Sequence, residues 1–308
     1  FISLNGTTGE VYKGKVETKA AEVSGDFAAL MDLCNKYTKL NVRTNADTPH
    51  DAEVARAFGA SGIGLCRTEH MFFDAEKIVA MREMILSPDV EGRRKALAKL
   101  LPFQKADFKG IFKAMDGCPV NVRLLDPPLH EFVPHDAKGQ EEMAKAMGVT
   151  VQEIKKRVES LCEHNPMLGH RGCRLGNTYP EITEMQTQAI LGAAIELKKE
   201  GYDPHPEIMV PLTGILYEFE AQEKVIRDAA AALFEKEGME ISFKVGTMIE
   251  IPRAALTANR IASRAEYFSF GTNDLTQMTF GYSRDDIASF LPVYLEKKIL
   301  KVDPFQVL

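Results

Sequence analysis

The chain has 308 residues, of which 45% are hydrophobic and 27% are charged, and its formal net charge at pH 7 is −6. This length suits one large barrel or two average domains. The acidic balance argues against a nucleic-acid surface, and the absence of a run of about 18 apolar residues argues against a membrane span. Five scattered cysteines without a CxxC motif indicate a reducing compartment, which we expect to be the cytoplasm.

The first 38 residues predict a small β-hairpin followed by a helix. Residues 1–18 hold two short apolar runs separated by NG and TG turn signals. A hairpin of this size is not stable alone, and the chain starts without Met, so we expect a fragment of a longer protein that begins with the end of a preceding domain. Residues 19–38 carry apolar residues at helical spacing, with Ser24 or Asp26 as the N-cap, and predict a linker helix.

From residue 39 onward, short β-rich segments alternate with helical segments, which predicts parallel βαβ units and an α/β fold. The predicted strands lie in segments 40–47, 62–70, 120–126, 170–176, 207–213, 243–250 and 267–274. The predicted helices span residues 49–58, 75–86, 91–115, 180–200, 215–236 and 252–263. Residues 126–165 interrupt the alternation, and we expect an inserted loop with helices of its own.

Charged residues follow every predicted strand instead of gathering at one crevice, which favours a (β/α)8 TIM-type barrel over an open doubly wound sheet. Seven strand units can be counted, and residues 281–308 contain no candidate for an eighth. We therefore expect residues 39–308 to form a barrel that is truncated before its eighth strand. The hairpin of 1–18 and the linker helix of 19–38 precede it.

Two acids follow consecutive predicted strands. Glu250 comes after VGTMI, and Asp274 comes after YFSFGTN. Because parallel strands end on one face of a sheet or barrel, we expect these side chains to lie close together. Mg²⁺ favours one or two carboxylates together with substrate oxygens and water. The pair predicts a Mg²⁺ site for an oxyanionic substrate, with the alternative that each acid caps the helix that follows it.

Two arginines also end predicted strands. Arg67 lies in GLCRTEH and Arg123 lies in NVRLLDPP. A guanidinium group fixed in this place suits bidentate binding of phosphate or carboxylate. The alternative is a salt bridge to a neighbouring acid such as Glu69 or Asp126. Weaker examples of the same pattern are Arg171, Arg174 and Arg284.

Gly271, Thr272 and Asn273 precede the last predicted helix. Backbone N–H groups at a helix N-terminus bind anions, and glycine allows a ligand to approach closely, although GTN is also a common turn. The seven histidines form no HxxxH or HxH pair, and no GxxxxGK phosphate loop is present. A barrel with a Mg²⁺ site and arginines suits enolate or phosphoryl-transfer chemistry.

Long motifs of the chain are similar to those of the phosphoenolpyruvate/pyruvate-binding domain in the pyruvate, phosphate dikinase family of PEP-utilising enzymes. The resemblance rests on GIGLCRTEHMFF (62–73), NVRLLDPPLHEFVP (121–134), NPMLGHRGCRLG (165–176), EMQTQAI (184–190), EIMVP (207–211), GTMIEIPRA (246–254) and FSFGTNDLTQMTFGYSRDD (268–286). Phosphoenolpyruvate synthase and enzyme I of the sugar phosphotransferase system share the GTNDLTQ and MIE-type motifs and are alternatives. A non-catalytic substrate-binding or dimerisation module is an alternative of another class.

The resemblance implies an enzyme that interconverts ATP, pyruvate and phosphate with AMP, phosphoenolpyruvate (PEP) and diphosphate. A phosphohistidine domain would carry the phosphoryl group from an ATP-binding domain to this barrel, in a protein expected to be a homodimer. Glu250 and Asp274 would hold Mg²⁺ with pyruvate, and Arg67 and Arg123 would bind the transferring phosphoryl group. Further substrate contacts would come from Gly271, Thr272, Asn273 and Arg284.

Two motifs of that family have no counterpart here. The phosphohistidine lies in a Thr-Ser-His-like motif, and the acid/base cysteine lies in a G-x-C-G-E-H-like motif on the eighth strand. Cys66 stands in a different context and is not a candidate for that role. The catalytic residues are therefore unknown, and we expect this chain to bind substrate and metal without completing the dikinase cycle alone. The segment 1–18 resembles the last strands of the phosphohistidine domain.

Overall fold

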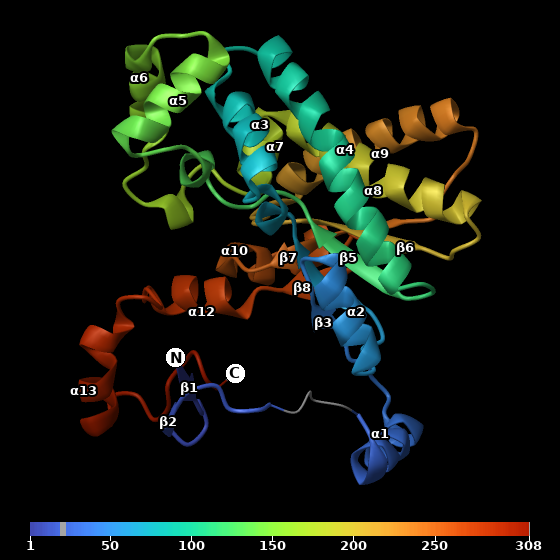
Figure 1. The fold of residues 1–308 in the computed structure, drawn as a ribbon, viewed down its shortest axis with the longest axis vertical. Helices are drawn as coiled ribbons and strands as arrows, with labels where there is room; N and C mark the ends of the chain where they lie inside the picture. The colour runs from blue at the N-terminus through green and yellow to red at the C-terminus, as the bar shows by residue number, and fades with distance from the viewer. Residues whose placement is uncertain (19–22, 308) are drawn as a thin grey trace.

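The computed structural model describes residues 1–18 and 23–307, and its main body is a parallel sheet covered by helices (Figure 1). Two strands near the N-terminus form a separate antiparallel hairpin, and the other six form one sheet. The strands are β1 (Ile2–Leu4), β2 (Val11–Lys13), β3 (Thr44–Asn45), β4 (Ile63–Arg67), β5 (Pro119–Arg123), β6 (His205–Val210), β7 (Lys244–Ile249) and β8 (Phe268–Phe270).

The six strands of the main sheet pair in chain order, from β3 to β8, and every pair is parallel. Helical connections run between them, as parallel pairing requires. The sheet curls into an open half-barrel, which confirms the predicted α/β fold of a truncated TIM-type barrel. Since all six strands run the same way, their C-terminal ends lie along one edge, and this edge carries the charged residues.

Most predicted helices form within two residues of their expected bounds. The α-helices are α1 (Gly25–Tyr37), α2 (Pro49–Ala57), α3 (Ala75–Leu86), α4 (Val90–Ala114), α5 (Ala137–Met147), α6 (Val151–Leu161), α7 (Cys173–Thr178), α8 (Pro180–Lys199), α9 (Leu216–Glu237), α10 (Pro252–Leu256), α11 (Ala258–Ile261), α12 (Thr272–Phe280) and α13 (Leu291–Glu296). Short 3₁₀ turns are η1 (Thr68–Phe72), η2 (Leu129–Phe132), η3 (Pro166–Leu168) and η4 (Ile287–Ser289). The helix expected at 252–263 is divided into α10 and α11.

The main hydrophobic core lies between the sheet and the helices α2, α4, α8 and α9. The central strands β5, β6 and β7 are buried along almost their whole length. Each fully buried aromatic or aliphatic side chain in such a core contributes about 1.5–3 kcal/mol. Representative members are Phe108, Phe112, Ile190, Ala193, Ile208, Val245 and Ile249.

A second core supports the inserted segment, where α5 and α6 form a lobe at the upper left of Figure 1. Its local sequence defines the two helices well. Gly148 ends α5 in the left-handed conformation, and Thr150 with Glu153 forms a capping box that starts α6. The apolar faces pack against α3, α4 and η2. The prediction of an inserted loop with helices at 126–165 is confirmed.

The strand predicted at 170–176 is wrong. Gly172 has φ 59°, its N–H donates to the carbonyl of Asp126, and the next N–H, of Cys173, donates to the carbonyl of Pro211. These two bonds attach the segment to the turns that follow β5 and β6, and the chain then enters α7. Because β5 and β6 pair directly, the sheet has six strands where seven units were expected.

At the two ends of the chain, the predictions hold for the described residues. β1 and β2 form the expected hairpin, and α1 covers most of the expected linker helix, of which 19–22 lie outside the described residues. Phe27 and Leu30 of α1 are about half exposed. Between 281 and 307 the chain forms η4 and α13 and no strand. None of the helices described is both long and apolar enough to cross a membrane.

Candidate active site

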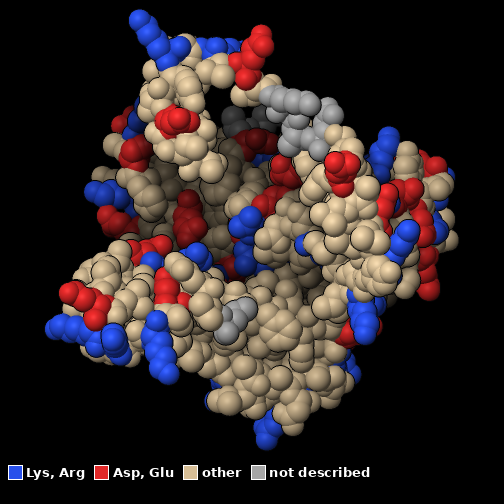
Figure 2. All heavy atoms as spheres, turned by 90° about the horizontal axis from the view of Figure 1, so that it is seen from below, with Lys and Arg blue, Asp and Glu red and all other residues tan. Residues whose placement is uncertain are grey.

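The C-terminal edge of the sheet brings together charged side chains from segments that are far apart in the sequence. Arg67 ends β4, Arg123 ends β5, Glu250 follows β7, and Asp274 lies in the first turn of α12 after β8. Figure 2 shows that acidic and basic side chains meet inside a hollow near the middle of one face of the molecule. This convergence defines the candidate site.

Asp126 is the centre of a buried network of ion pairs. Its side chain is only 2% exposed, and Oδ2 lies 2.9 Å from Nη1 of Arg123 and 2.5 Å from Nη2 of Arg171. Arg123 also donates through Nη2 to Glu69. Arg123 thus forms salt bridges to both acids that the sequence named as its alternative partners, and its binding of an oxyanion stays a prediction.

The network keeps its arginines charged in spite of burial. Burial by itself would lower the pKa of Arg123, but the carboxylates of Asp126 and Glu69 outweigh burial, and the pKa is raised. The same balance raises the pKa of Arg171, with Asp126 as its main partner. Nε of Arg123 is buried and makes no hydrogen bond among the described residues. A fixed cation with a free N–H donor is suited to an oxyanion.

Glu250 is the acid of the site whose ionised form is least favoured by its surroundings. It is 1% exposed, and Oε1 accepts a 2.6 Å hydrogen bond from the N–H of Leu212. Oε2 is buried and has no hydrogen-bond partner in the described chain. Burial first, and then the negative charges of Asp126 and Asp274, raise the pKa of Glu250 to about 8. The positive charge of Arg123 acts in the opposite direction but does not outweigh burial and the two acids.

Neither acid of the predicted metal pair caps a helix. The N-cap of α10 is Ile251 and that of α12 is Gly271, and neither cap has a side-chain hydrogen bond. Asp274 instead lies 3.9 Å from Nη2 of Arg171, and its charge acts on Glu250. The capping alternative is wrong for both residues, which leaves their side chains directed to the site.

The donor set of this site fits Mg²⁺. Glu250 and Asp274 offer carboxylate oxygens, one of them unpartnered in a negative environment, and Mg²⁺ takes one or two carboxylates with substrate oxygens and water. Within 1–18 and 23–307, no group of three or more His, Cys, Asp or Glu side chains is arranged to hold a metal by itself. The protein would therefore supply part of the coordination shell and a substrate the rest. Mg²⁺ stays a prediction.

The start of α12 lies against Glu250. A Cβ atom on Gly271 would stand 2.7 Å from Cβ and Oε2 of Glu250, so only glycine allows this approach. Nη1 of Arg284 donates to Oδ1 of Asn273 over 2.8 Å. Asn273 and Arg284 line a cavity of about 190 Å³, together with Thr272 and Phe305.

Gly271→Ala is expected to displace Glu250 and so to weaken any ligand that depends on it. A contact of 2.7 Å cannot be accommodated by a backbone or Cβ atom, so α12 or the Glu250 side chain must move. We expect a destabilisation of about 1–3 kcal/mol, measured by urea unfolding. Gly281→Ala tests whether the position matters, since nothing lies within 4 Å of a Cβ at Gly281. Its cost is expected to come from its positive φ alone.

Arg67 and Arg174 contact other groups than the acids that the sequence suggested as partners. The side chain of Arg67 is paired with Asp47, 3.3 Å from Nη2, and not with Glu69. Arg174 donates to the carbonyls of Leu168 and Gly169 and does not join the acidic cluster.

The roles of Asp47 and Asp126 were missed by sequence reasoning. Each follows a predicted strand, and this position was the available signal, but Asp47 was not considered and Asp126 only as the partner of one arginine. Arg171 was rated a weak candidate, yet it pairs with both Asp126 and Asp274.

Cys66 is a core residue of this fold. It is fully buried in the main core, and burial, together with the nearby Asp47 and Glu69 carboxylates, raises the pKa of its thiol well above the usual range. Cys118 and Cys173 are buried as well, as expected for small apolar residues. The two exposed cysteines are Cys34 and Cys162.

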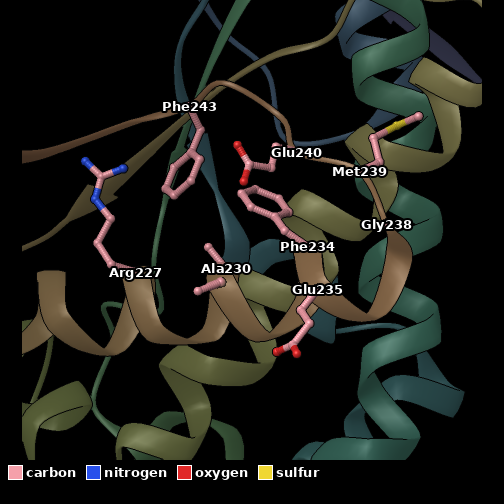
Figure 3. Close-up of a pocket in the computed structure, with 9 residues that line it drawn as sticks. Arg227, Ala230, Phe234, Glu235, Gly238, Met239, Glu240 and Phe243 are labelled. Carbon is pink, nitrogen blue, oxygen red and sulfur yellow. The ribbon is translucent and has the colours of Figure 1, made fainter.

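A larger hollow, of about 520 Å³, lies away from this chemistry (Figure 3). It is formed by the end of α9 and the loop that leads into β7. It therefore lies at the N-terminal edge of the sheet, opposite the candidate site. Phe234 and Phe243 line it, and Arg227 lies over the ring of Phe243 and pairs with Glu266. Its arginine is held by these contacts, and its two other charged side chains, Glu235 and Glu240, are both acidic, so the hollow lacks the mixed acids and arginines of the candidate site.

Comparison with known proteins agrees with the architecture of the site. The family described as PEP-utilising enzyme, PEP-binding domain, matches residues 21–304. This chain belongs to that family. The PEP-binding domain thus covers the whole half-barrel and the inserted lobe, and the acids and arginines described above lie within it.

Curated relatives of this chain are named pyruvate, phosphate dikinase. The protein of Giardia intestinalis is 58% identical over 305 residues, which are 99% of this chain and 34% of that protein. The protein of Clostridium symbiosum is 56% identical over 306 residues, 99% of this chain and 35% of that protein. The chloroplastic protein of Arabidopsis thaliana is 56% identical over 310 residues, 100% of this chain and 32% of that protein. The chain therefore spans about a third of the length of these relatives.

Proposed function

We propose that the chain is the substrate-binding part of a pyruvate, phosphate dikinase, in which pyruvate and PEP are interconverted with the help of Mg²⁺. The single observation that supports this most is the buried Glu250, with one oxygen unpartnered and the pKa raised to about 8 by burial and two further acids. A divalent cation would relieve this excess of negative charge. A substrate with two adjacent oxygens would complete the metal's coordination.

In this proposal Glu250 and Asp274 hold Mg²⁺, which when bound stabilises negative charge on the substrate's oxygens. The N–H of Leu212 holds Oε1 of Glu250, so that Oε2 is left for the metal. At the start of α12, Gly271, Thr272 and Asn273 supply backbone and amide donors to the substrate carboxylate. Arg284 lies against Asn273 and adds positive charge at that end.

The phosphoryl group is bound by the two arginines at the ends of β4 and β5. Arg67 and Arg123 each have a buried Nε without a partner among the described residues. Arg123 is held by Asp126 and Glu69, and Nη2 of Arg67 lies 3.3 Å from Asp47, so little side-chain entropy is lost when an oxyanion binds.

The names of the relatives favour the dikinase over phosphoenolpyruvate synthase and enzyme I of the sugar phosphotransferase system. The proposal further includes a phosphohistidine domain in the full-length protein as the phosphoryl carrier, an ATP-binding domain and a homodimer. The compartment is proposed to be the cytoplasm, or an organelle if the full-length protein carries a targeting segment. A module that binds substrate without catalysis is the competing reading.

The proposal is tested by calorimetric titration of the chain with oxalate, an analogue of the pyruvate enolate. We expect binding with Mg²⁺ and none when a chelator removes it, because the negative cluster repels oxalate without a cation. Glu250→Gln is expected to abolish the Mg²⁺-dependent binding. The matched variant Glu53→Gln, at an exposed position of α2, is expected to bind like the wild type. Equal binding of oxalate with and without Mg²⁺ would contradict the metal assignment.

A further inference from the structure

Asp47 contacts Arg67 in two ways. Its Oδ1 accepts a 2.7 Å hydrogen bond from the backbone N–H of Arg67, and its Oδ2 lies 3.3 Å from Nη2 of the same residue. A third contact comes from His70, whose Nδ1 is 2.7 Å from Oδ2. The carboxylate is mostly buried, with a side chain that is 12% exposed. One acid therefore fixes both the backbone and the head group of an arginine that ends a strand.

The backbone alone does not hold Arg67 firmly. β3 and β4 pair over a short and irregular stretch, with Thr44 opposite Ile63 and Asn45 opposite Leu65. β3 has two residues and is an edge strand of the sheet in the described chain. The side chain of Asp47 continues the connection between the two strands beyond the last paired residues, at the point where Arg67 leaves the sheet.

Nε of Arg67 is a hydrogen-bond donor that remains available for a ligand. Nη2 is directed to Asp47, while Nε is buried and has no partner in the described chain. A buried N–H group without an acceptor costs about 1–3 kcal/mol, so a ligand oxygen at that place would be favoured. The side chain is 38% exposed, which leaves a way for a ligand to reach it.

We propose that Asp47 is the positioning residue that aims Arg67 at the phosphoryl group of PEP, and that His70 holds Asp47 in place. This inference rests on the proposed function, because it assigns PEP as the ligand of Arg67. His70 donates from Nδ1 to a carboxylate oxygen that also faces Arg67, so the orientation of the carboxylate is fixed by three donors. Asp47 touches no reacting atom and acts through Arg67.

The test compares two ligands that share a carboxylate and differ in the phosphoryl group. Asp47→Asn keeps one acceptor oxygen and replaces the other with an NH₂ group, which cannot accept a hydrogen bond. The NH₂ group then faces either the backbone N–H of Arg67 or the side chains of Arg67 and His70, so at least one of these contacts is lost. With Mg²⁺ present, we expect PEP to bind about tenfold more weakly, as for the loss of one charge-assisted hydrogen bond. Oxalate, which has no phosphoryl group, is expected to bind within roughly twofold of the wild type.

Two further variants separate positioning from a purely structural role. His70→Leu removes the donor at an exposed position and is expected to weaken PEP selectively, whereas His70→Gln retains an N–H donor and is expected to restore PEP binding. Asp51→Asn, four residues from Asp47 in the first turn of α2, is the control and should leave both ligands unaffected.

The possible failures are distinguishable. A wild-type chain that binds neither oxalate nor PEP with Mg²⁺ overturns the proposed function and this inference with it. If the wild type binds both, the positioning role is overturned when Asp47→Asn or His70→Leu weakens oxalate as much as PEP, or weakens neither. Selective loss of PEP in both variants, with recovery in His70→Gln, supports it.

Discussion

Glu250→Gln is expected to make the metal-free chain more stable at neutral and alkaline pH while it abolishes Mg²⁺-dependent ligand binding. The glutamine has the same shape, its oxygen still accepts from the N–H of Leu212, and its neutral amide is not repelled by the charges of Asp126 and Asp274. The expected gain is about 4 kcal/mol at pH 8, because the pKa of Glu250 rises from 4.5 to about 8 and each unit corresponds to about 1.4 kcal/mol. This corresponds to a rise of the unfolding temperature on the order of 5–10 °C.

The sign follows from the direction of the pKa shift. The pKa of Glu250 is raised in the folded chain from 4.5 to about 8, so the folded state binds the proton more tightly than the unfolded state. Below the unfolded pKa both states are protonated and Glu250 carries no penalty. As the pH rises from 4.5 towards 8, Glu250 ionises in the unfolded state but stays protonated in the folded state, so the folded state loses stability relative to the unfolded state.

The measurement is thermal unfolding in chelator at pH 5 and at pH 8, for the wild type and for Glu250→Gln. The variant should gain little at pH 5 and most at pH 8, and added Mg²⁺ should stabilise the wild type more than the variant. Glu53→Gln should follow the wild type throughout. A variant that is less stable than the wild type at pH 8 would show that Glu250 is not a repelled charge.

Asp126→Ala is expected to destabilise the chain by about 3–5 kcal/mol, the usual cost of removing one partner from a buried ion pair. Arg123 loses one contact, at 2.9 Å, and Arg171 loses two, at 2.5 and 3.3 Å. The change also removes one of the charges that repel Glu250, which is favourable. Because each charge-assisted hydrogen bond contributes about 1.5–3 kcal/mol, three lost bonds outweigh this relief.

Urea unfolding at pH 7 measures this effect, with Asp32→Ala on the exposed helix α1 as the matched control. The control is expected to stay within about 0.5 kcal/mol of the wild type. Asp126→Asn should lie between the two, because an amide oxygen still accepts from one arginine. A stability for Asp126→Ala equal to that of the control would mean that Arg123 and Arg171 find other partners.

Local pattern was sufficient for most of the fold. The alternation of apolar strands with amphipathic helices predicted α2, α3, α4, α8 and α9, since burial on one face of a helix and on both faces of a strand leaves a clear period in the sequence. The same pattern failed at 170–176. That segment has the composition of a strand, but Gly172 takes a positive φ and bonds to turns after β5 and β6.

In the candidate site, too, the sequence predicted some features and missed others. The rule that parallel strands end on one edge was enough to select Glu250, Asp274, Arg67 and Arg123. It did not reveal that Asp126 joins two arginines, since that depends on how the turn after β5 meets the turn before α7.

By itself, the sequence determined an α/β fold of the PEP-utilising family, read as a truncated barrel of seven strands, with acids and arginines at its C-terminal edge. Only the tertiary structure decided which charges are paired and which are not. The physical reason is that an ion pair depends on distance and burial, and both depend on neighbouring strands in three dimensions. Asp47 and Arg67 are 20 residues apart in the chain and 2.7 Å apart from Oδ1 to backbone N. That Oε2 of Glu250 has no hydrogen-bond partner in the described chain likewise depends on the three-dimensional arrangement of its neighbours.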